Sequence, residues 1–146
     1  MTQIFHRFMT MLVLAAALTA TPSFAQQGAA PAGGNRLVVQ VTDGDAARWN
    51  MTLNNIRNVQ TDLGAANVEI VLVAYGPGIN MLKFDAVTQT RVSEAIKSGV
   101  KVVACENTLV NLKVSKLDMH PDISYVPTGV VEIMRRQQQG FSYLRP

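Results

Sequence analysis

Short apolar runs alternate along the chain with longer segments in which apolar residues recur at every third or fourth position. Over Ala46–Leu63 this helical spacing is clear, and Gly64 follows as a helix stop. Residues 68–74 (VEIVLVA) are almost wholly apolar, as expected for a strand covered on both faces. The same criteria predict strands at 36–42, 100–104, 123–126 and 141–144, helices at 85–98, 106–112 and 129–139, and short turns at 79–82 and 115–119. Asp85 is predicted to cap the second helix.

The alternation of strands and helices predicts a single α/β domain over residues 36–146. Its sheet is expected to be mostly parallel, with about five strands and helices on both faces. In such sheets, functional sites lie outside the carboxyl ends of the strands. The loops at 43–45, 75–78 and 104–108 are therefore the predicted location of a site.

The start of the chain has the three parts of a secretory signal peptide. They are the basic residues His6 and Arg7, the apolar run Phe8–Ala20 and the small-x-small cleavage site Ser23-Phe24-Ala25. A membrane anchor is disfavoured because the apolar run is short for a bilayer and a cleavage site follows it. Residues 26–35 (QQGAAPAGGN) are rich in Gly, Ala and Pro and are predicted to be a flexible leader. We therefore expect residues 1–25 to be removed and the mature chain to work in a bacterial-type periplasm or outside the cell.

Charge adds little information about partners. The formal net charge of +3 falls to about +2 when Arg7 leaves with the signal segment. This imbalance is too small to indicate nucleic acid or an anionic membrane surface as a partner. No other apolar stretch is long enough for a transmembrane helix, so no membrane contact is expected after cleavage.

The single cysteine, Cys105, lies where an α/β protein usually places a functional residue. It follows the predicted strand at 100–104 and precedes residues 106–109, the first turn of a predicted helix. The positive end of a helix dipole and its unpaired N–H groups favour the thiolate, which is the reactive form. One cysteine in an oxidising compartment cannot form an intramolecular disulfide. It is buried and inert, paired with another molecule, or a working thiol, and the residue types alone leave these alternatives open.

The rest of the sequence limits the reactions open to Cys105. A cysteine hydrolase needs a nearby base, but His120 lies beside Pro121 in a predicted loop that nothing brings to the thiol. The chain has no C-x-x-C, which excludes a dithiol couple within one chain. A thiol that accepts a group and passes it on, as in persulfide transfer, needs no base if a helix terminus lowers its pKa. Glu106 is ambiguous, because its carboxylate can raise the pKa of the thiol or simply stabilise the first helical turn.

Two other groups of residues are candidates for binding. The loop Gly76-Pro77-Gly78 is either a backbone cradle for an anion or sulfur species near Cys105, or only a turn. Asn54 and Asn58 share one face of a predicted helix although asparagine is a poor helix former. They suit a polar contact with a subunit or a site, and a solvated face is the alternative.

No metal or cofactor is predicted. Asp43 and Asp45 have no third ligand nearby, so a helix cap explains them better than a metal site. The glycine loop lacks a Walker-type Gly-Lys-Ser/Thr and the full spacing of a dinucleotide loop.

Four motifs of the mature chain are modest individually and specific together. The first is Trp49-Asn50-x-x-Leu53-Asn54-Asn55-x-x-Asn58, and the second is Val73-Ala74-Tyr75-Gly76-Pro77-Gly78-Ile79. The third is Gly99-Val100, which leads to Ala104-Cys105-Glu106-Asn107-Thr108-Leu109. The fourth combines Val126-Pro127-x-Gly129-Val130-Val131-Glu132 with Arg136-Gln137-x-x-Gly140-x-x-Tyr143-x-Arg145-Pro146. In this order they resemble the exported branch of the DsrE/DsrF-like family, over nearly all of the mature chain. The resemblance implies a flavodoxin-like, three-layer α/β fold and homo- or hetero-oligomers, often trimers or hexamers. It also implies that Cys105 occupies the position of a cysteine that, in cytoplasmic relatives, carries sulfur as a persulfide in relays for sulfur oxidation or tRNA thiolation.

The leading hypothesis is therefore a small periplasmic sulfur carrier or sulfurtransferase-like protein, in which Cys105 accepts sulfane sulfur as a persulfide and hands it to a partner. The residues expected to take part in binding are Gly76, Pro77, Gly78, Glu106, Asn107, Asn54 and Asn58. Two alternatives stay open. One is a non-catalytic oligomeric binding or assembly module with a buried cysteine, and the other is a thiol redox sensor. The expected partners are further copies of the chain, as a trimer or hexamer, and a sulfur donor or acceptor protein.

Overall fold

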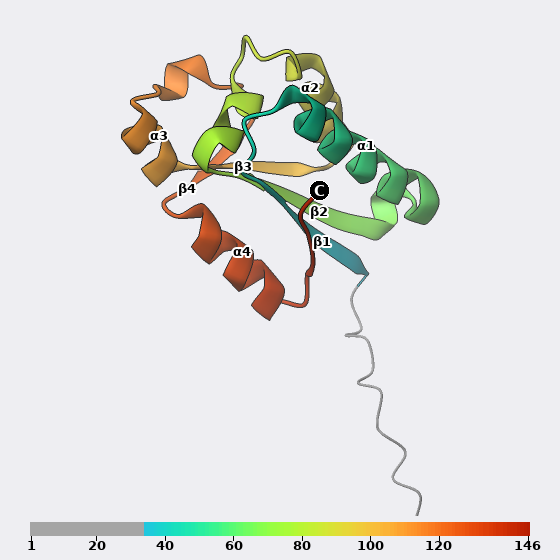
Figure 1. Cartoon of the computed structure of the whole chain (residues 1–146). Helices are drawn as coiled ribbons and strands as arrows, with labels where there is room; N and C mark the ends of the chain where they lie inside the picture. The colour runs from blue at the N-terminus through green and yellow to red at the C-terminus, as the bar shows by residue number, and fades with distance from the viewer. Residues whose placement is uncertain (1–33) are drawn as a thin grey trace, which may run out of the picture. The chain divides into compact units, whose positions relative to one another are not determined.

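Residues 34–146 are described by the computed structural model, and they form one five-stranded sheet with helices packed against it (Figure 1). The predicted signal peptide at 1–25 and nearly all of the predicted leader lie outside these residues. In spatial order the strands are β4 (Ser124–Val126), β3 (Lys101–Cys105), β2 (Val68–Ala74), β1 (Asn35–Val41) and β5 (Ser142–Leu144). Every neighbouring pair of these strands is parallel. The structure therefore confirms the predicted α/β class with a five-stranded parallel sheet and a flavodoxin-like, three-layer arrangement.

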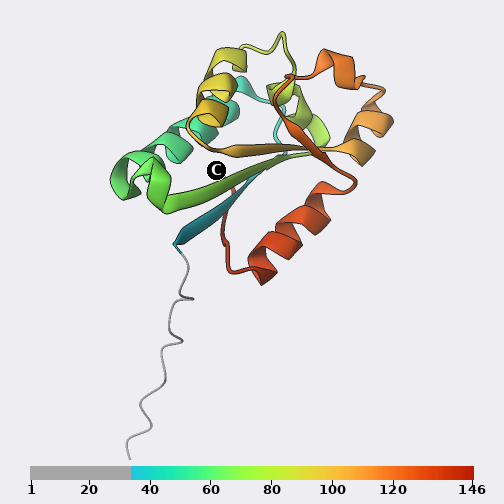
Figure 2. The ribbon, with the colours of Figure 1, turned by 180° about the vertical axis from the view of Figure 1, so that it is seen from behind.

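The helices divide unequally between the two faces of the sheet. One face is covered by α1 (Ala46–Leu63), α2 (Gln89–Lys97) and α3 (Glu106–Leu112), and the other by α4 (Gly129–Gln138) alone (Figures 1 and 2). The connections also contain short 3-10 helices, η1 (Ala65–Asn67), η2 (Gly76–Leu82) and η3 (Lys116–Asp118). Right-handed crossovers explain the division, because the chain steps in one direction from β1 to β4 and then returns to place β5 beside β1. None of the helices within residues 34–146 is long and apolar enough to cross a membrane.

Alternating residues of the strands divide the core into two clusters. The larger cluster, under α1, α2 and α3, includes Val39 and Leu72 of the sheet. The smaller cluster lies under α4, and its buried members are Val38, Val71, Val73, Val103, Ile133 and Phe141. Residues 34–146 therefore hold a complete hydrophobic core of their own, and the chain from Gln26 onward contains this whole folded unit.

Local sequence signals place α1 and β2 at the predicted bounds. The Asp45 carboxylate accepts a hydrogen bond from the Ala47 N–H at 3.1 Å, which caps α1 at its start. Gly64 ends α1 at a φ of 84°, a conformation that favours glycine. Both strand and helix therefore follow from neighbouring residues alone.

The predicted start of α2 is wrong. Asp85 does not cap this helix, which begins at Gln89 with Thr88 as the preceding residue. Residues 84–88 form turns instead, in which the Ala86 N–H donates to the Lys83 carbonyl oxygen at 3.2 Å and the Gln89 N–H donates to the Ala86 carbonyl oxygen at 2.9 Å. These turns follow Lys83, which pairs with Met119 in an isolated antiparallel bridge. Thr88 is buried, and its hydroxyl donates to the Met81 carbonyl oxygen at 3.1 Å.

Candidate functional site at Cys105

Cys105 lies at the carboxyl ends of two neighbouring strands, β3 and β4, whose following helices pack on opposite faces of the sheet. It is the last residue of β3, and the chain then enters α3 on the three-helix face. The neighbouring strand β4 leads instead into α4 on the other face, through Pro127 and Thr128. A parallel sheet opens a crevice at such a switch point, and this is where ligands bind in doubly wound folds. The topology therefore makes the end of β3 the primary candidate site.

The Cys105 side chain faces α4 and is held closely by the start of that helix. Its exposed fraction is 5%, and its Sγ lies 3.8 Å from the Pro127 carbonyl oxygen, to which the thiol donates. At Gly129, the first residue of α4, an added Cβ would lie 3.3 Å from the Cys105 Cβ and 3.2 Å from the Tyr75 ring. A residue without a side chain at position 129 therefore lets the helix terminus approach the sulfur.

The surroundings of Cys105 act on the pKa of its thiol in both directions. Burial raises the pKa of the Cys105 thiol, but the Thr108 hydroxyl and the N–H groups of Gly129, Thr108 and Asn107 lower it. The net effect is a pKa below the ordinary value of a thiol. Hydrogen bonds to the charged form of a group favour that form, so the site favours the thiolate.

Thr108 links this sulfur to the glycine loop. The Gly76 N–H donates to the Thr108 Oγ1 at 3.0 Å, which leaves the hydroxyl hydrogen of Thr108 for the sulfur of Cys105. The sequence-based prediction did not include Thr108. The signal that could have found it is its position three residues after the helix cap, where a side chain faces the cap.

Gly76, Pro77 and Gly78, which were predicted to form a loop, are the first three residues of η2. Gly76 has a φ of 55°, and its N–H is occupied by Thr108. The Gly78 N–H donates to the Thr42 carbonyl oxygen at 3.1 Å, and Pro77 is exposed at the surface. Both glycine N–H groups are thus paired within the chain, and the loop acts on Cys105 through Thr108.

Tyr75 is a second residue that sequence reasoning missed. Its ring lies against Gly129, as the approach of 3.2 Å shows. Burial raises the pKa of Tyr75, as do nearby Tyr143 and Cys105, while Arg145 and a hydrogen bond with Gln40 lower it. The carboxyl ends of β1, β2, β3 and β5 therefore place a row of polar groups beside the thiol.

The two residues after Cys105 differ in what they contact. Glu106 forms an ion pair with Lys116, so its carboxylate is directed to the surface of α3 and η3. The Asn107 N–H donates to the Pro127 carbonyl oxygen at 3.2 Å, and its side-chain amide donates to the Thr128 hydroxyl at 3.2 Å. Asn107 therefore ties the loop after β3 to the loop after β4, on either side of the sulfur.

Asn54 and Asn58 do not lie with the residues around Cys105. Both are exposed on α1, which covers the three-helix face, whereas the Cys105 side chain faces α4. The Asn54 side-chain oxygen accepts a hydrogen bond from Arg91 of α2 at 2.7 Å. These asparagines belong to a different part of the surface.

Both ring nitrogens of His120 form hydrogen bonds, and neither of them is to Cys105. It is 2% exposed, its Nδ1 accepts from the Asp122 N–H at 3.2 Å, and its Nε2 lies 2.7 Å from the Ser93 Oγ. Because Nδ1 accepts, the neutral ring carries its proton on Nε2 and donates to Ser93. His120 is therefore neither a base for Cys105 nor one for Ser93.

Replacing His120 with alanine is expected to lower the free energy of unfolding by about 2–4 kcal/mol, because it leaves a cavity and an unpaired Asp122 N–H. Urea unfolding followed by the fluorescence of Trp49, the single tryptophan, measures this effect. The rate at which Cys105 is alkylated in the folded variant should not change. A slower reaction in fully folded protein would show that His120 acts on the thiol.

Within residues 34–146, no three side chains of His, Cys, Asp or Glu form a group that could hold a metal ion.

No protein-family model matches the chain, and no curated protein matches it. Several solved structures are similar. BT1422 from Bacteroides thetaiotaomicron is 18% identical with a TM-score of 0.63, covering 77% of this chain and 95% of that chain. The ychN protein from E. coli is 13% identical with a TM-score of 0.63, covering 77% of this chain and 99% of that chain. At these identities, the two structures show the shared fold alone.

The protein of unknown function MTH1491 from Methanobacterium thermoautotrophicum is more similar in sequence. It is 36% identical with a TM-score of 0.73, and the match covers 77% of this chain and 99% of that chain. Since the identity extends over nearly the whole length of that protein, this chain belongs to the same family as MTH1491.

Proposed function

We propose that this chain is an exported member of the DsrE/DsrF-like family that carries sulfane sulfur as a persulfide on Cys105. The observation that supports it most directly is the position of Cys105 at the carboxyl end of β3, beside the starts of α3 and α4. There the Thr108 hydroxyl and nearby backbone N–H groups lower the pKa of the thiol. Such donors stabilise negative charge on sulfur. The motifs that resemble the family, which include Cys105, support the family placement over nearly all of the mature chain.

The proposed reaction needs no oxidant and no cofactor. The Cys105 thiolate attacks the outer sulfur of a donor persulfide, R–S–SH, and a new S–S bond forms while the S–S bond of the donor breaks. The donor leaves as the thiolate RS⁻, and the outer sulfur keeps its proton as Cys105–S–SH. An acceptor thiolate then attacks the same outer sulfur, and Cys105 leaves as a thiolate that its hydrogen bonds stabilise. The transferred sulfur keeps its oxidation state throughout.

The proposed setting is the periplasm, with residues 1–25 removed as a signal peptide. We further propose that the mature chain assembles into a homo-oligomer, a trimer or a hexamer, and exchanges sulfur with a donor or acceptor protein. Three large apolar side chains are exposed and would be available for contacts in such an assembly. Val87 is 80% exposed, Val110 is 75% exposed and Leu117 is 90% exposed.

A second candidate function is an oligomeric binding or assembly module in which the cysteine is structural. The 5% exposure of Cys105 favours it, since free cysteine is often buried as a small apolar residue. The two functions differ in whether the folded protein presents a reactive thiol.

The test uses the chain from Gln26 onward, reduced and then treated with inorganic polysulfide. We expect the intact mass to rise by one sulfur atom and the gain to be absent in Cys105→Ser. Alkylation of the folded protein should reach half its maximal rate at a lower pH than a free thiol, because the site lowers the pKa of Cys105.

Three results would contradict the carrier. If the Cys105 thiol is alkylated only after the protein is unfolded, the assembly module is the function that remains. The protein should also be treated in separate samples with mild peroxide and with polysulfide. An intact mass that rises by oxygen in the peroxide sample, with no gain of sulfur in the polysulfide sample, would indicate a redox sensor. A sulfur gain that persists in Cys105→Ser would place the chemistry elsewhere.

A further inference from the structure

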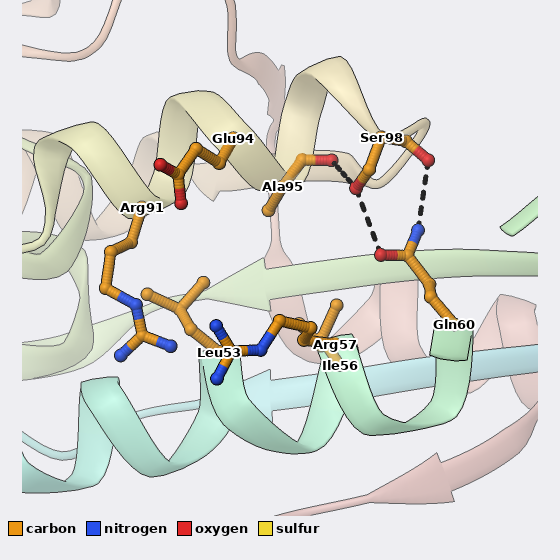
Figure 3. Close-up of a pocket in the computed structure, with 8 residues that line it drawn as sticks. All are labelled: Leu53, Ile56, Arg57, Gln60, Arg91, Glu94, Ala95 and Ser98. Carbon is orange, nitrogen blue, oxygen red and sulfur yellow. Dashed lines mark hydrogen bonds between the residues drawn. The ribbon is translucent and has the colours of Figure 1, made fainter. Parts of the chain in front are cut away.

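A small cleft lies between α1 and α2 on the face of the sheet opposite to the Cys105 side chain. Its volume is about 180 Å³, and its floor is formed by Leu53, Ile56 and Ala95 (Figure 3). Gln60 and Ser98 close one end by hydrogen bonds to each other. Ligand sites for drug-sized molecules are larger, at roughly 300–1,000 Å³, so this cleft fits a ligand of only a few non-hydrogen atoms.

Arg91 stands at the other end and is held only by neutral groups. Its guanidinium donates to the Asn54 side-chain oxygen at 2.7 Å, to the Asn50 carbonyl oxygen at 3.3 Å and to the Asn50 side-chain oxygen. An aspartate at either position would pair with Arg91 and cancel its charge. Asparagine fixes the orientation of the guanidinium and leaves its positive charge in place, which accounts for two poor helix formers inside α1.

A second arginine faces the first across the cleft. Figure 3 shows the Arg57 side chain running along α1, with its guanidinium directed toward that of Arg91. Neither arginine forms an ion pair with a carboxylate of residues 34–146. Glu94 also lines the cleft, so its net formal charge is about +1. Two like charges directed at one another repel, and an anion between them removes that repulsion.

We propose that the α1–α2 cleft binds a small monocarboxylate, with its carboxylate between Arg57 and Arg91 and its short apolar chain on Leu53 and Ile56. Guanidinium groups pair with carboxylates by two parallel hydrogen bonds. The hydrogen bonds of Arg91 to Asn50 and Asn54 use Nη1 and one hydrogen of Nη2, so Nε and the second hydrogen of Nη2 are left for a carboxylate. Glu94 disfavours a second negative charge on the ligand. The site is independent of the chemistry proposed for Cys105.

The test is an amide-resolved NMR titration of the chain from Gln26 onward with sodium butyrate, at constant pH and ionic strength. Saturable shifts confined to α1 and α2 are expected, with a dissociation constant in about the millimolar range. Arg91→Gln and Asn54→Asp should each weaken binding at least about tenfold, since each removes the available charge of Arg91. Arg135→Gln, an exposed arginine of α4, is the matched control and should bind as the unchanged chain does.

Three results would overturn the proposal. Butylammonium chloride is expected to leave these amides unshifted, and equal shifts from it would show apolar contact alone. Unchanged affinity in a folded Asn54→Asp variant would show that Arg91 does not hold the ligand. Shifts of the same amides on raising the protein concentration without butyrate would identify the face as a contact between copies of the chain.

Discussion

Replacing Gly78 with alanine is expected to lower the free energy of unfolding by about 4 kcal/mol or more, because no other glycine compared within residues 34–146 would bring an added Cβ so close to backbone atoms. An added Cβ would lie 2.4 Å from the Val41 carbonyl oxygen, 2.7 Å from the Val41 carbonyl carbon and 2.9 Å from the Thr42 Cα. All three atoms are backbone at or directly after the end of β1, where Val41 pairs with Ala74 of β2 and the Val41 carbonyl oxygen accepts from the Tyr75 N–H at 3.1 Å. Such a strand cannot move aside easily, so the start of η2, which contains Gly78, must shift instead.

Urea unfolding followed by Trp49 fluorescence measures this loss, with two glycines as controls. Gly99→Ala meets no atom within 4 Å and should cost only about 1 kcal/mol, the strain of its φ of 94°. Gly34→Ala meets one atom at 3.4 Å, an ordinary contact, and should be nearly neutral. A Gly78→Ala protein as stable as Gly34→Ala would show that the loop accommodates a side chain and that the close approach to β1 is not required.

Replacing Thr108 with valine is expected to slow alkylation of Cys105 by about tenfold at neutral pH, since a hydrogen bond to a charged group contributes about 1.5–3 kcal/mol. Valine keeps the shape of threonine but has no hydroxyl to donate to the sulfur. The pKa of Cys105 should therefore rise, and less thiolate should be present at a given pH. Removing the hydroxyl also leaves the Gly76 N–H without its acceptor, which should lower stability by about 1–3 kcal/mol.

Thr108→Ser is the matched control, because serine keeps the hydroxyl that joins Gly76 to Cys105. Its pH profile of alkylation should resemble that of the unchanged chain, while that of Thr108→Val should move to higher pH. The measurement is the rate of alkylation against pH in folded protein. Equal profiles for the valine and serine variants would show that the N–H groups alone set the acidity of the thiol.

The positions of the regular elements could be predicted from sequence where local signals decide them. The helix over Ala46–Leu63 and the strand over Val68–Ala74 depend on apolar spacing, on the Asp45 cap and on Gly64, all of which are neighbours in the chain. The start of α2 was not predicted, because residues 84–88 form turns after a segment that is held by distant residues. In that segment Lys83 pairs with Met119, and the Phe84 N–H donates to the Asp118 carbonyl oxygen.

The candidate site could be predicted only in part for the same reason. Cys105 stands at a strand-to-helix junction, which is a local pattern and needs no knowledge of the rest of the fold. Its neighbours Tyr75 and Gly129 follow the strands β2 and β4, and they lie beside Cys105 only because parallel strands end at one edge of the sheet. The role of Asn54 was equally hidden, since Arg91 lies 37 residues further along the chain.

By itself the sequence determined the α/β class, the order of strands and helices, and the place of the one thiol, because each depends on short-range spacing and composition. Only the tertiary structure decided the order of strands in the sheet, the separate faces on which Cys105 and Asn54 lie, and the donors that gather on the sulfur. These features depend on contacts between distant segments, which form when crossover connections bury the two faces of the sheet.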